Sequence, residues 1–274
     1  MDRSIKKEDV YTVKIYFIKP IDLISVVVNT LIEMEYETYT VSEFDAEKLP
    51  RILPEDRRNV LFICVTSRQE AQRWLEYAQT LRDEPSSQIQ IGVFAFSNIG
   101  SALKEKFLMN QISVTPFDQL RQNTLGVLRT ILQIFECRGQ RQYIRVKAQG
   151  HSEALISVSG RDQPIKGSIV DLSTSAFVCD VPEIYHHYFG AGQYIREILL
   201  VLRGIRIRTA AKFLGYSQEN KNHFIMKFCT LSMKDGRFDY EEQISRGPKQ
   251  KLCNYIRTCL KDSLMERLSA LAAK

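Results

Sequence analysis

The chain has 274 residues and a mass of 31.7 kDa, with 44% hydrophobic and 26% charged residues. These values exclude a disordered chain, a collagen-like chain and a coiled-coil rod, and the length predicts two domains. The net charge of +6 is unevenly distributed: residues 1–137 carry 16 basic and 19 acidic side chains, a net −3, and residues 138–274 carry 22 and 13, a net +9. We therefore predict an acidic domain of residues 1–137 and a basic domain of residues 138–274.

The first half alternates short apolar runs with segments of helical periodicity. The apolar runs are rich in β-branched and aromatic residues, and they lie at residues 13–18, 38–41, 60–65, 89–96 and 112–114. Between them, apolar residues recur at spacings of three and four, as in residues 23–32 and 68–82. Strands that are apolar throughout, alternating with helices, are typical of a parallel sheet covered on both faces. The first half is therefore predicted to be a doubly wound α/β domain.

The order of these elements resembles the receiver domain of two-component response regulators, but the residues of its chemistry are absent. The acidic pair expected after the first strand is replaced by Lys19-Pro20-Ile21-Asp22, and the phosphoacceptor position after the third strand by Cys64-Val65-Thr66-Ser67. Thr115-Pro116 stands in place of the expected Lys-Pro. A single carboxylate cannot hold the magnesium ion that this reaction requires, and we interpret Asp22 as a helix N-cap. We expect a receiver-like domain without a phosphoacceptor that docks an unidentified downstream protein.

The second half changes to short strands with turn signals. Alternating or apolar runs lie at residues 143–148, 154–158, 167–171, 177–181, 198–202, 205–208 and 223–228. Six or seven strands within so short a segment predict a small antiparallel barrel or sandwich. After the helix breaker Gly247-Pro248, an apolar stripe at helical spacing follows: Leu252, Tyr255, Ile256, Cys259, Leu260, Leu264 and Leu268. We expect this helix to cover the barrel of its own chain, in preference to pairing with another subunit.

Two polar segments of the second half carry the candidate function. Arg141 and Arg145 form an RxxxR pattern at the domain junction, and residues 171–176, Asp-Leu-Ser-Thr-Ser-Ala, follow at the end of a strand. Together they resemble the paired signature of PilZ domains, RxxxR followed by [D/N]xSxxG. The strand spacing and the closing helix fit the same family, over about residues 140–268. The resemblance implies a six-stranded barrel that binds the bacterial second messenger cyclic di-GMP.

The resemblance also implies a role for each residue. Arg141 and Arg145 would clamp phosphate oxygens and guanine edges, because the planar guanidinium group donates two parallel hydrogen bonds. Asp171 would accept hydrogen bonds from guanine, and Ser173 would serve the phosphate, the base or the local turn. Arg138, just outside the motif, would add a contact. Ala176 replaces the usual glycine, and if its φ is positive we expect a cost of about 1 kcal/mol that weakens binding.

Other classes of function find less support in the sequence. The six cysteines are scattered without a CxxC pair, and neither they nor His186-His187 have metal-ligand spacing, so we expect reduced thiols and no metal site. We find no arrangement of a nucleophile and a base in the sequence that would indicate an enzyme. The longest uncharged stretch, residues 85–103, is too polar to span a membrane, and the charged N-terminus lacks a signal-peptide core. We expect a cytoplasmic protein.

Two alternatives to a cyclic di-GMP receptor stay open. A basic barrel on an α/β scaffold could bind RNA or DNA, although the aromatic and basic surface motifs of known RNA readers are absent and nucleic acid is the less favoured ligand. A PilZ-type barrel that has lost its ligand could act only as a protein adaptor. The replacement at Ala176 favours this second alternative, and the intact arginines argue against it.

Overall fold

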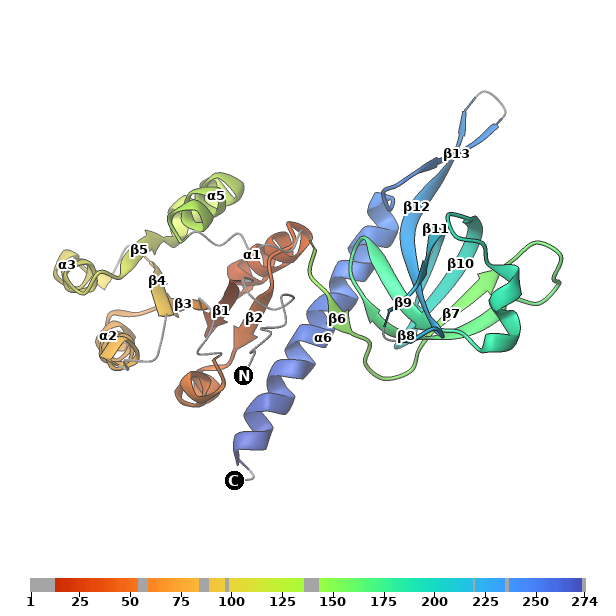
Figure 1. Cartoon of the computed structure of the whole chain (residues 1–274). Coiled ribbons are helices and arrows are strands. Elements are labelled where there is room, and N and C mark those ends of the chain that lie inside the picture. Colours follow the sequence, from red (N-terminus) through yellow and green to blue (C-terminus); the bar gives the residue numbers. More distant parts are fainter. Residues whose placement is uncertain are drawn as a thin grey trace, which may run out of the picture. The chain divides into compact units, whose positions relative to one another are not determined.

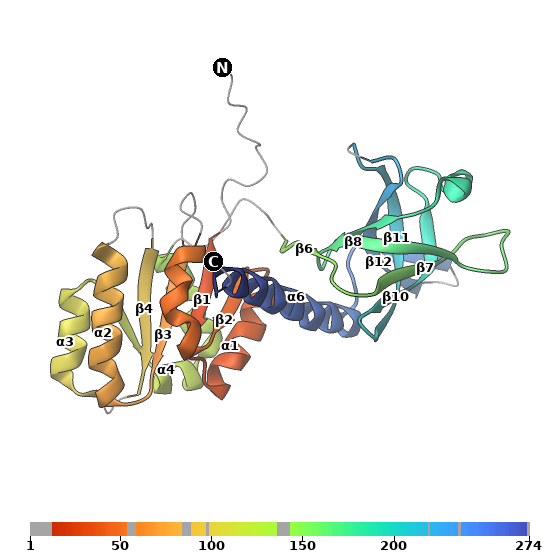
Figure 2. The same cartoon turned by 90° about the horizontal axis from the view of Figure 1, so that it is seen from below.

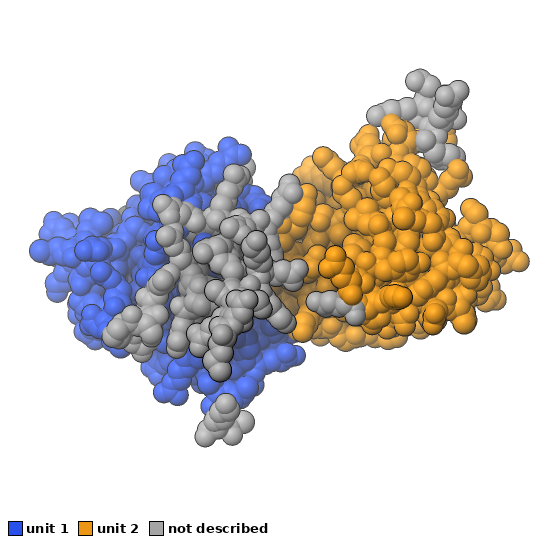
Figure 3. Space-filling view, in the orientation of Figure 1, with its two compact units in different colours: residues 1–142, 261–274 blue, residues 143–260 orange. Residues whose placement is uncertain are grey.

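The computed structural model describes residues 13–53, 59–83, 89–96, 99–135, 143–218, 220–234 and 237–272. They group into two compact units, unit 1 with residues 1–142 and 261–274 and unit 2 with residues 143–260 (Figure 3). The last helix contributes to both units, because its residues from 261 onward are grouped with unit 1.

Unit 1 is built on a five-stranded parallel sheet with the strand order β2-β1-β3-β4-β5 (Figure 1). Its strands are β1 Lys14–Ile18, β2 Thr38–Val41, β3 Asn59–Val65, β4 Ile89–Ala95 and β5 Ser113–Pro116. Helices α1 Asp22–Glu33 and α5 Thr124–Ile134 lie on one face of the sheet, and α2 Arg68–Asp83 and α3 Ser101–Met109 lie on the other (Figures 1 and 2). The short helix α4 Phe117–Gln122 precedes α5. The strand order is that of flavodoxin-like doubly wound sheets.

The core of unit 1 explains this architecture. All seven residues of β3, the central strand, are buried, since helices cover both of its faces. Aromatic side chains cross the sheet from strand to strand, with the ring of Phe62 5.2 Å from those of Phe17 and Phe94. The apolar side chains at helical spacing in α1 and α2 are buried against the strands. The predicted doubly wound α/β domain is confirmed.

Two local features of unit 1 differ from the sequence interpretation. Residues 43–52, between β2 and β3, form the 3-10 helix η1 Glu43–Ile52, which begins where the hydroxyl of Ser42 accepts a hydrogen bond from the backbone N–H of Asp45 at 3.2 Å. The interpretation of Asp22 as an N-cap is wrong. Ile21 occupies the cap position without a side-chain hydrogen bond, and Asp22 lies in the first turn of α1, where its charge favours the helix dipole.

Unit 2 is a closed antiparallel barrel of six strands. Around the barrel the order is β7-β8-β9-β12-β11-β10, and the pairing of β10 with β7 closes the ring. The strands are β7 Ser152–Ser157, β8 Ile165–Leu172, β9 Ala176–Asp180, β10 Tyr194–Leu202, β11 Ile205–Tyr216 and β12 His223–Lys234. The two-residue strand β6 Val146–Lys147 pairs with β8, and β13 Arg237–Glu241 pairs with β12. The 3-10 helix η3 Glu183–Tyr188 connects β9 to β10.

Alternation along the strands fills the barrel with apolar side chains. The most buried side chains include Leu200, Phe213, Phe224, Met226 and Phe228, each at most 1% exposed. Along β12, Ile225 and Lys227 alternate with these residues and are half-buried. The six-stranded barrel that the PilZ resemblance implied is confirmed.

Helix α6 Arg246–Ala272 ends the described chain, and the whole predicted stripe from Leu252 to Leu268 is buried. The hydroxyl of Tyr255 fixes the first half of α6 to the barrel. It accepts a hydrogen bond from the Gln149 N–H at 3.0 Å and lies 2.9 Å from the hydroxyl of Ser152 on β7. The stripe up to Leu260 belongs to the unit of the barrel, as expected, and its last two members fall in unit 1.

Candidate ligand-binding site

The two polar segments of the predicted motif meet at one end of the barrel. Strand β6 pairs with β8 so that Lys147 lies directly opposite Asp171, and Arg145 stands two residues before Lys147. Nε of Arg145 lies 3.7 Å from Oδ1 of Asp171, within ion-pair distance. The Arg145 side chain is 59% exposed and that of Asp171 24%, so the guanidinium group faces solvent. Arg138 and Arg141, the other predicted arginines, lie outside the described residues.

Ser173 lies in the turn between β8 and β9, and its hydroxyl organises that turn. The hydroxyl oxygen accepts hydrogen bonds from the N–H of Ser175 at 3.2 Å and of Ala176 at 3.1 Å. The Ser173 backbone N–H donates to the Ala176 carbonyl at 2.8 Å, and the residue is 5% exposed. Three roles are expected for this hydroxyl: contact with a phosphate, contact with a base, or support of the local turn. The structure shows the third role, because the hydroxyl holds the turn that leads into the start of β9.

Ala176, at the glycine position of the motif, begins β9 and is half-buried. Among the described residues, the non-glycine positions with positive φ are Lys19, Glu35, Gln111 and Arg203. Ala176 is not one of them, so the condition for the predicted strain is not met. Its methyl group costs no backbone strain here, and the replacement leaves the conformation of the turn compatible with the motif.

A row of outward-facing residues continues from Ala176 across three further strands. Ala176 lies directly opposite Lys227 on β12, Lys227 opposite Lys212 on β11, and Lys212 opposite Tyr194 on β10. Directly opposed residues of antiparallel strands point to the same face of the sheet. We call these four residues the outer row. Sequence reasoning missed its lysines, although the alternation of Phe224, Met226 and Phe228 already placed Lys227 on the outer face.

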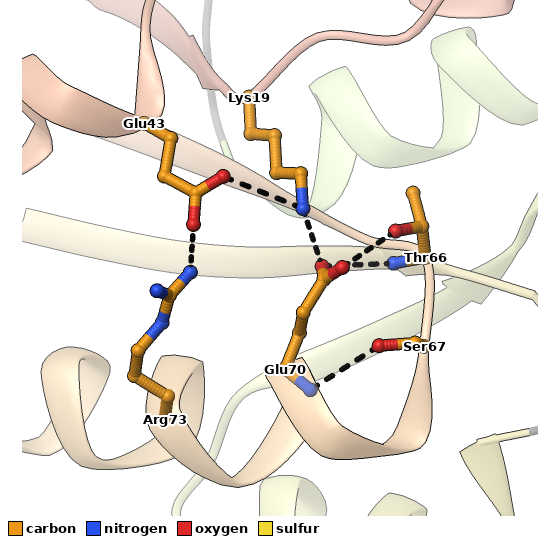
Figure 4. A network of polar contacts seen from close by, with 6 residues as sticks. All are labelled: Lys19, Glu43, Thr66, Ser67, Glu70 and Arg73. Atoms are coloured by element: carbon orange, nitrogen blue, oxygen red, sulfur yellow. Dashed lines mark hydrogen bonds and ion pairs between the residues drawn. The ribbon is translucent and has the colours of Figure 1, made fainter.

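A second polar cluster lies at the carboxyl ends of the parallel strands of unit 1, where receiver domains carry their chemistry (Figure 4). Lys19, directly after β1, places Nζ 2.8 Å from a carboxylate oxygen of Glu70 on α2 and 3.4 Å from one of Glu43 on η1. Arg73 on α2 also pairs with Glu43. The Thr66 hydroxyl donates to Glu70 at 2.8 Å, and the Ser67 hydroxyl accepts from the Glu70 N–H at 3.3 Å.

The charges of this cluster neutralise one another. Burial alone would raise the pKa of Glu70, but hydrogen bonds from Lys19 and Thr66 outweigh it and leave the pKa below its ordinary value. The hydrogen bond from Arg73 likewise lowers the pKa of Glu43. An ammonium group therefore lies between two carboxylates where a receiver would bind a metal cation. The cluster links β1, η1 and α2 by ion pairs.

Metal and membrane features are absent from the described part of the chain. Its His, Cys, Asp and Glu side chains form no group of three or more that could hold a metal ion. No helix within the described ranges is both long enough and apolar enough to span a membrane.

Comparisons with known proteins find solved structures that are similar to part of this chain. No protein-family model matches the sequence, and no curated protein matches it. Among solved structures, YcgR from Escherichia coli in complex with c-di-GMP matches 49% of this chain and 51% of its own, at 13% identity and a TM-score of 0.36.

Two further solved structures are similar to part of this chain. The PilZ domain of E. coli YcgR with c-di-GMP matches 47% of this chain and 98% of its own, at 14% identity and a TM-score of 0.34. The MrkH–c-di-GMP complex of K. pneumonia matches 49% and 56%, at 10% identity and a TM-score of 0.30. This chain spans about half the length of the YcgR and MrkH structures.

Proposed function

We propose that the chain is a cytoplasmic receptor, not an enzyme, that binds cyclic di-GMP on the outer face of the barrel where β8 passes into β9. The site uses the residues of both motifs, Arg141, Arg145, Asp171, Ser173 and Ala176, together with Arg138 just outside the first motif. The observation that carries the proposal is the 3.7 Å separation of Arg145 and Asp171. This ion pair supports the convergence of two sequence segments on one end of the barrel.

The chemistry of the ligand suits these residues. Cyclic di-GMP carries two phosphodiester charges and two guanine bases, and a guanidinium group can meet phosphate oxygens or guanine O6 and N7 with two hydrogen bonds. Arg145 presents such a group to solvent beside Asp171, whose carboxylate can accept from the N–H groups of guanine. Ser173 contributes by holding the turn, so its effect on the ligand is indirect.

Ligand binding in this proposal acts on the connection between the units. Residues 138–145 include the boundary between the two units, after residue 142, and lead into β6, so a ligand that holds Arg141 and Arg145 together would fix the geometry of this segment. In this proposal, fixing the segment alters how the two units interact with each other or with a downstream protein. Unit 1, with a neutralised ion cluster at the receiver position, serves in this proposal as the docking domain for that protein.

Isothermal titration calorimetry with cyclic di-GMP tests the proposal. We expect the wild type to bind and Arg145→Ala to bind at least about tenfold more weakly, because each charge-assisted hydrogen bond contributes about 1.5–3 kcal/mol. Arg208→Ala is the matched control, since Arg208 is an exposed arginine of the same barrel that pairs with Glu197 at 3.3 Å, and it should bind as the wild type does.

Three outcomes would contradict the proposal. Equal binding by Arg145→Ala and the wild type would remove Arg145 from the site. Absence of binding by the folded wild type would favour the adaptor alternative. Binding of RNA or DNA that weakens over several decades with salt, without uptake of cyclic di-GMP, would favour the nucleic-acid alternative.

A further inference from the structure

Two lysines of the outer row share one carboxylate. Lys212 and Lys227 are directly opposed on β11 and β12, a position at which like charges repel. Glu242 lies between them, with Oε1 3.3 Å from the Lys212 ammonium and Oε2 2.5 Å from that of Lys227. The cluster of two cations and one anion keeps a net positive charge. Glu242 therefore relieves the repulsion between the lysines without neutralising them.

This cluster is continuous with the proposed cyclic di-GMP site. Lys227 is the cross-strand neighbour of Ala176, and neighbouring strands lie about 5 Å apart. Asp171 lies opposite Val178 on β9, which points to the same face as Ala176 two residues away. The hydrogen bond to Glu242 raises the pKa of Lys227, so its ammonium group stays charged beside Ala176.

An aromatic pair borders the lysines on the other side. The rings of Tyr194 and Tyr240 stack with centroids 4.3 Å apart and an interplanar angle of 23°. The Lys212 ammonium lies 5.0 Å from the centroid of the Tyr194 ring. A polar surface with ammonium groups beside stacked aromatic rings suits a ligand that has both phosphates and planar bases.

The side chains of this cluster are accessible. Lys212, Lys227 and Glu242 are 26%, 35% and 44% exposed, so ligand oxygens can reach the ammonium groups. Exposed ion pairs of this kind are weak, since water screens them. The hydrogen bonds from both lysines lower the pKa of Glu242, so the carboxylate stays ionised at neutral pH and is a competitor for any phosphate that approaches.

We propose that Lys212 and Lys227 form an additional phosphate-contacting part of the cyclic di-GMP site, which Glu242 occupies until a ligand phosphate displaces it. This inference rests on the proposed function. The position of Glu242 gives the exchange a structural consequence, because residues 242–245 connect β13 to α6. A phosphate that takes both lysines releases the segment at which α6 begins.

Calorimetry with cyclic di-GMP on five variants of the full chain tests the exchange. Glu242→Gln removes the competing charge and should bind about three- to tenfold more tightly than the wild type. Lys227→Gln should bind about tenfold more weakly. The triple variant Lys227→Gln/Lys212→Gln/Glu242→Gln should bind no more tightly than the double variant Lys227→Gln/Lys212→Gln, because the carboxylate then has no lysine to compete for. Glu197→Gln, which removes a carboxylate from an ion pair with Arg208, is the matched control and should match the wild type.

Hydrogen exchange of residues 242–250 gives a second readout, which should rise when the wild type binds ligand and should already be raised in ligand-free Glu242→Gln. Circular dichroism verifies that each variant is folded. If Arg145→Ala loses binding but Glu242→Gln and Lys227→Gln bind as the wild type does, the proposed function stands and this inference is wrong. If the wild type does not bind at all, both are wrong.

Discussion

Replacement of Ser173 by alanine should destabilise the barrel more than its small change in volume suggests. The residue is 5% exposed, and its hydroxyl accepts from the N–H groups of Ser175 and Ala176. Each net hydrogen bond contributes about 1 kcal/mol, and a buried donor left without an acceptor costs about 1–3 kcal/mol. We therefore expect Ser173→Ala to lower the free energy of unfolding of unit 2 by about 2 kcal/mol.

Ser175→Ala is the matched control for this prediction. The Ser175 hydroxyl lies 3.1 Å from that of Ser173, whereas the backbone of Ser175 makes the contacts that order the turn. We expect Ser175→Ala to cost less than about 0.5 kcal/mol. Urea unfolding followed by far-ultraviolet circular dichroism measures the barrel, and hydrogen exchange at the Ser175 and Ala176 amides reports the turn itself. Equal stability of the two variants would refute the role assigned to the Ser173 hydroxyl.

Two further substitutions test other parts of the account. Ala176→Gly should lower the stability of the barrel by about 0.5–1 kcal/mol, because glycine loses more conformational entropy when it is fixed in a strand. The same substitution should leave the affinity for cyclic di-GMP within about twofold of the wild type. A tenfold gain in affinity measured by calorimetry would show that the methyl group obstructs the ligand. Lys19→Met should destabilise unit 1 by about 1 kcal/mol at pH 7, measured by urea unfolding with the fluorescence of the single tryptophan, Trp74. The lowered pKa values of Glu70 and Glu43 stabilise the fold above about pH 4.5, and this stability is lost as the pH falls through their folded-state values, so the difference from the wild type should vanish near pH 3. Lys106→Met, an exposed lysine on α3, is the control, and a difference that persists unchanged at pH 3 would contradict the ion-pair explanation.

The two folds follow from hydrophobic periodicity, which the sequence displays directly. β3 is apolar along its whole length because both of its faces are covered, and that pattern is typical of a parallel sheet. In the barrel, the alternation of Phe224, Met226 and Phe228 indicates which face of β12 points inward. The stripe of α6 marks a buried helix in the same way. These signals are local, so each can be recognised without knowledge of its partner.

The features that sequence reasoning missed depend on partners far apart in the chain. η1 contains Pro50, and its buried residues Ala46, Leu49 and Ile52 recur every three residues, so the 3.6-residue period expected of an α-helix does not reveal it. Lys19 pairs with Glu43 and Glu70 because β1 lies between β2 and β3 in the sheet, so that the segments following these strands meet at one edge.

Strand register limits prediction of the site for the same reason. Register shifts interrupt β10 against β11 and β11 against β12, so counting residues along the strands cannot predict that Lys212 lies opposite Lys227 and Tyr194. Arg145 and Asp171 were found because their spacing matched a known motif. Glu242 belongs to no such pattern.

Hydrogen exchange of the full chain, measured with and without cyclic di-GMP, tests the central claim most directly. We predict that the dinucleotide protects the amides of residues 143–148 and 171–176, on both sides of the Arg145–Asp171 pair. No protection of either segment at saturating ligand would contradict the claim that this end of the barrel binds cyclic di-GMP.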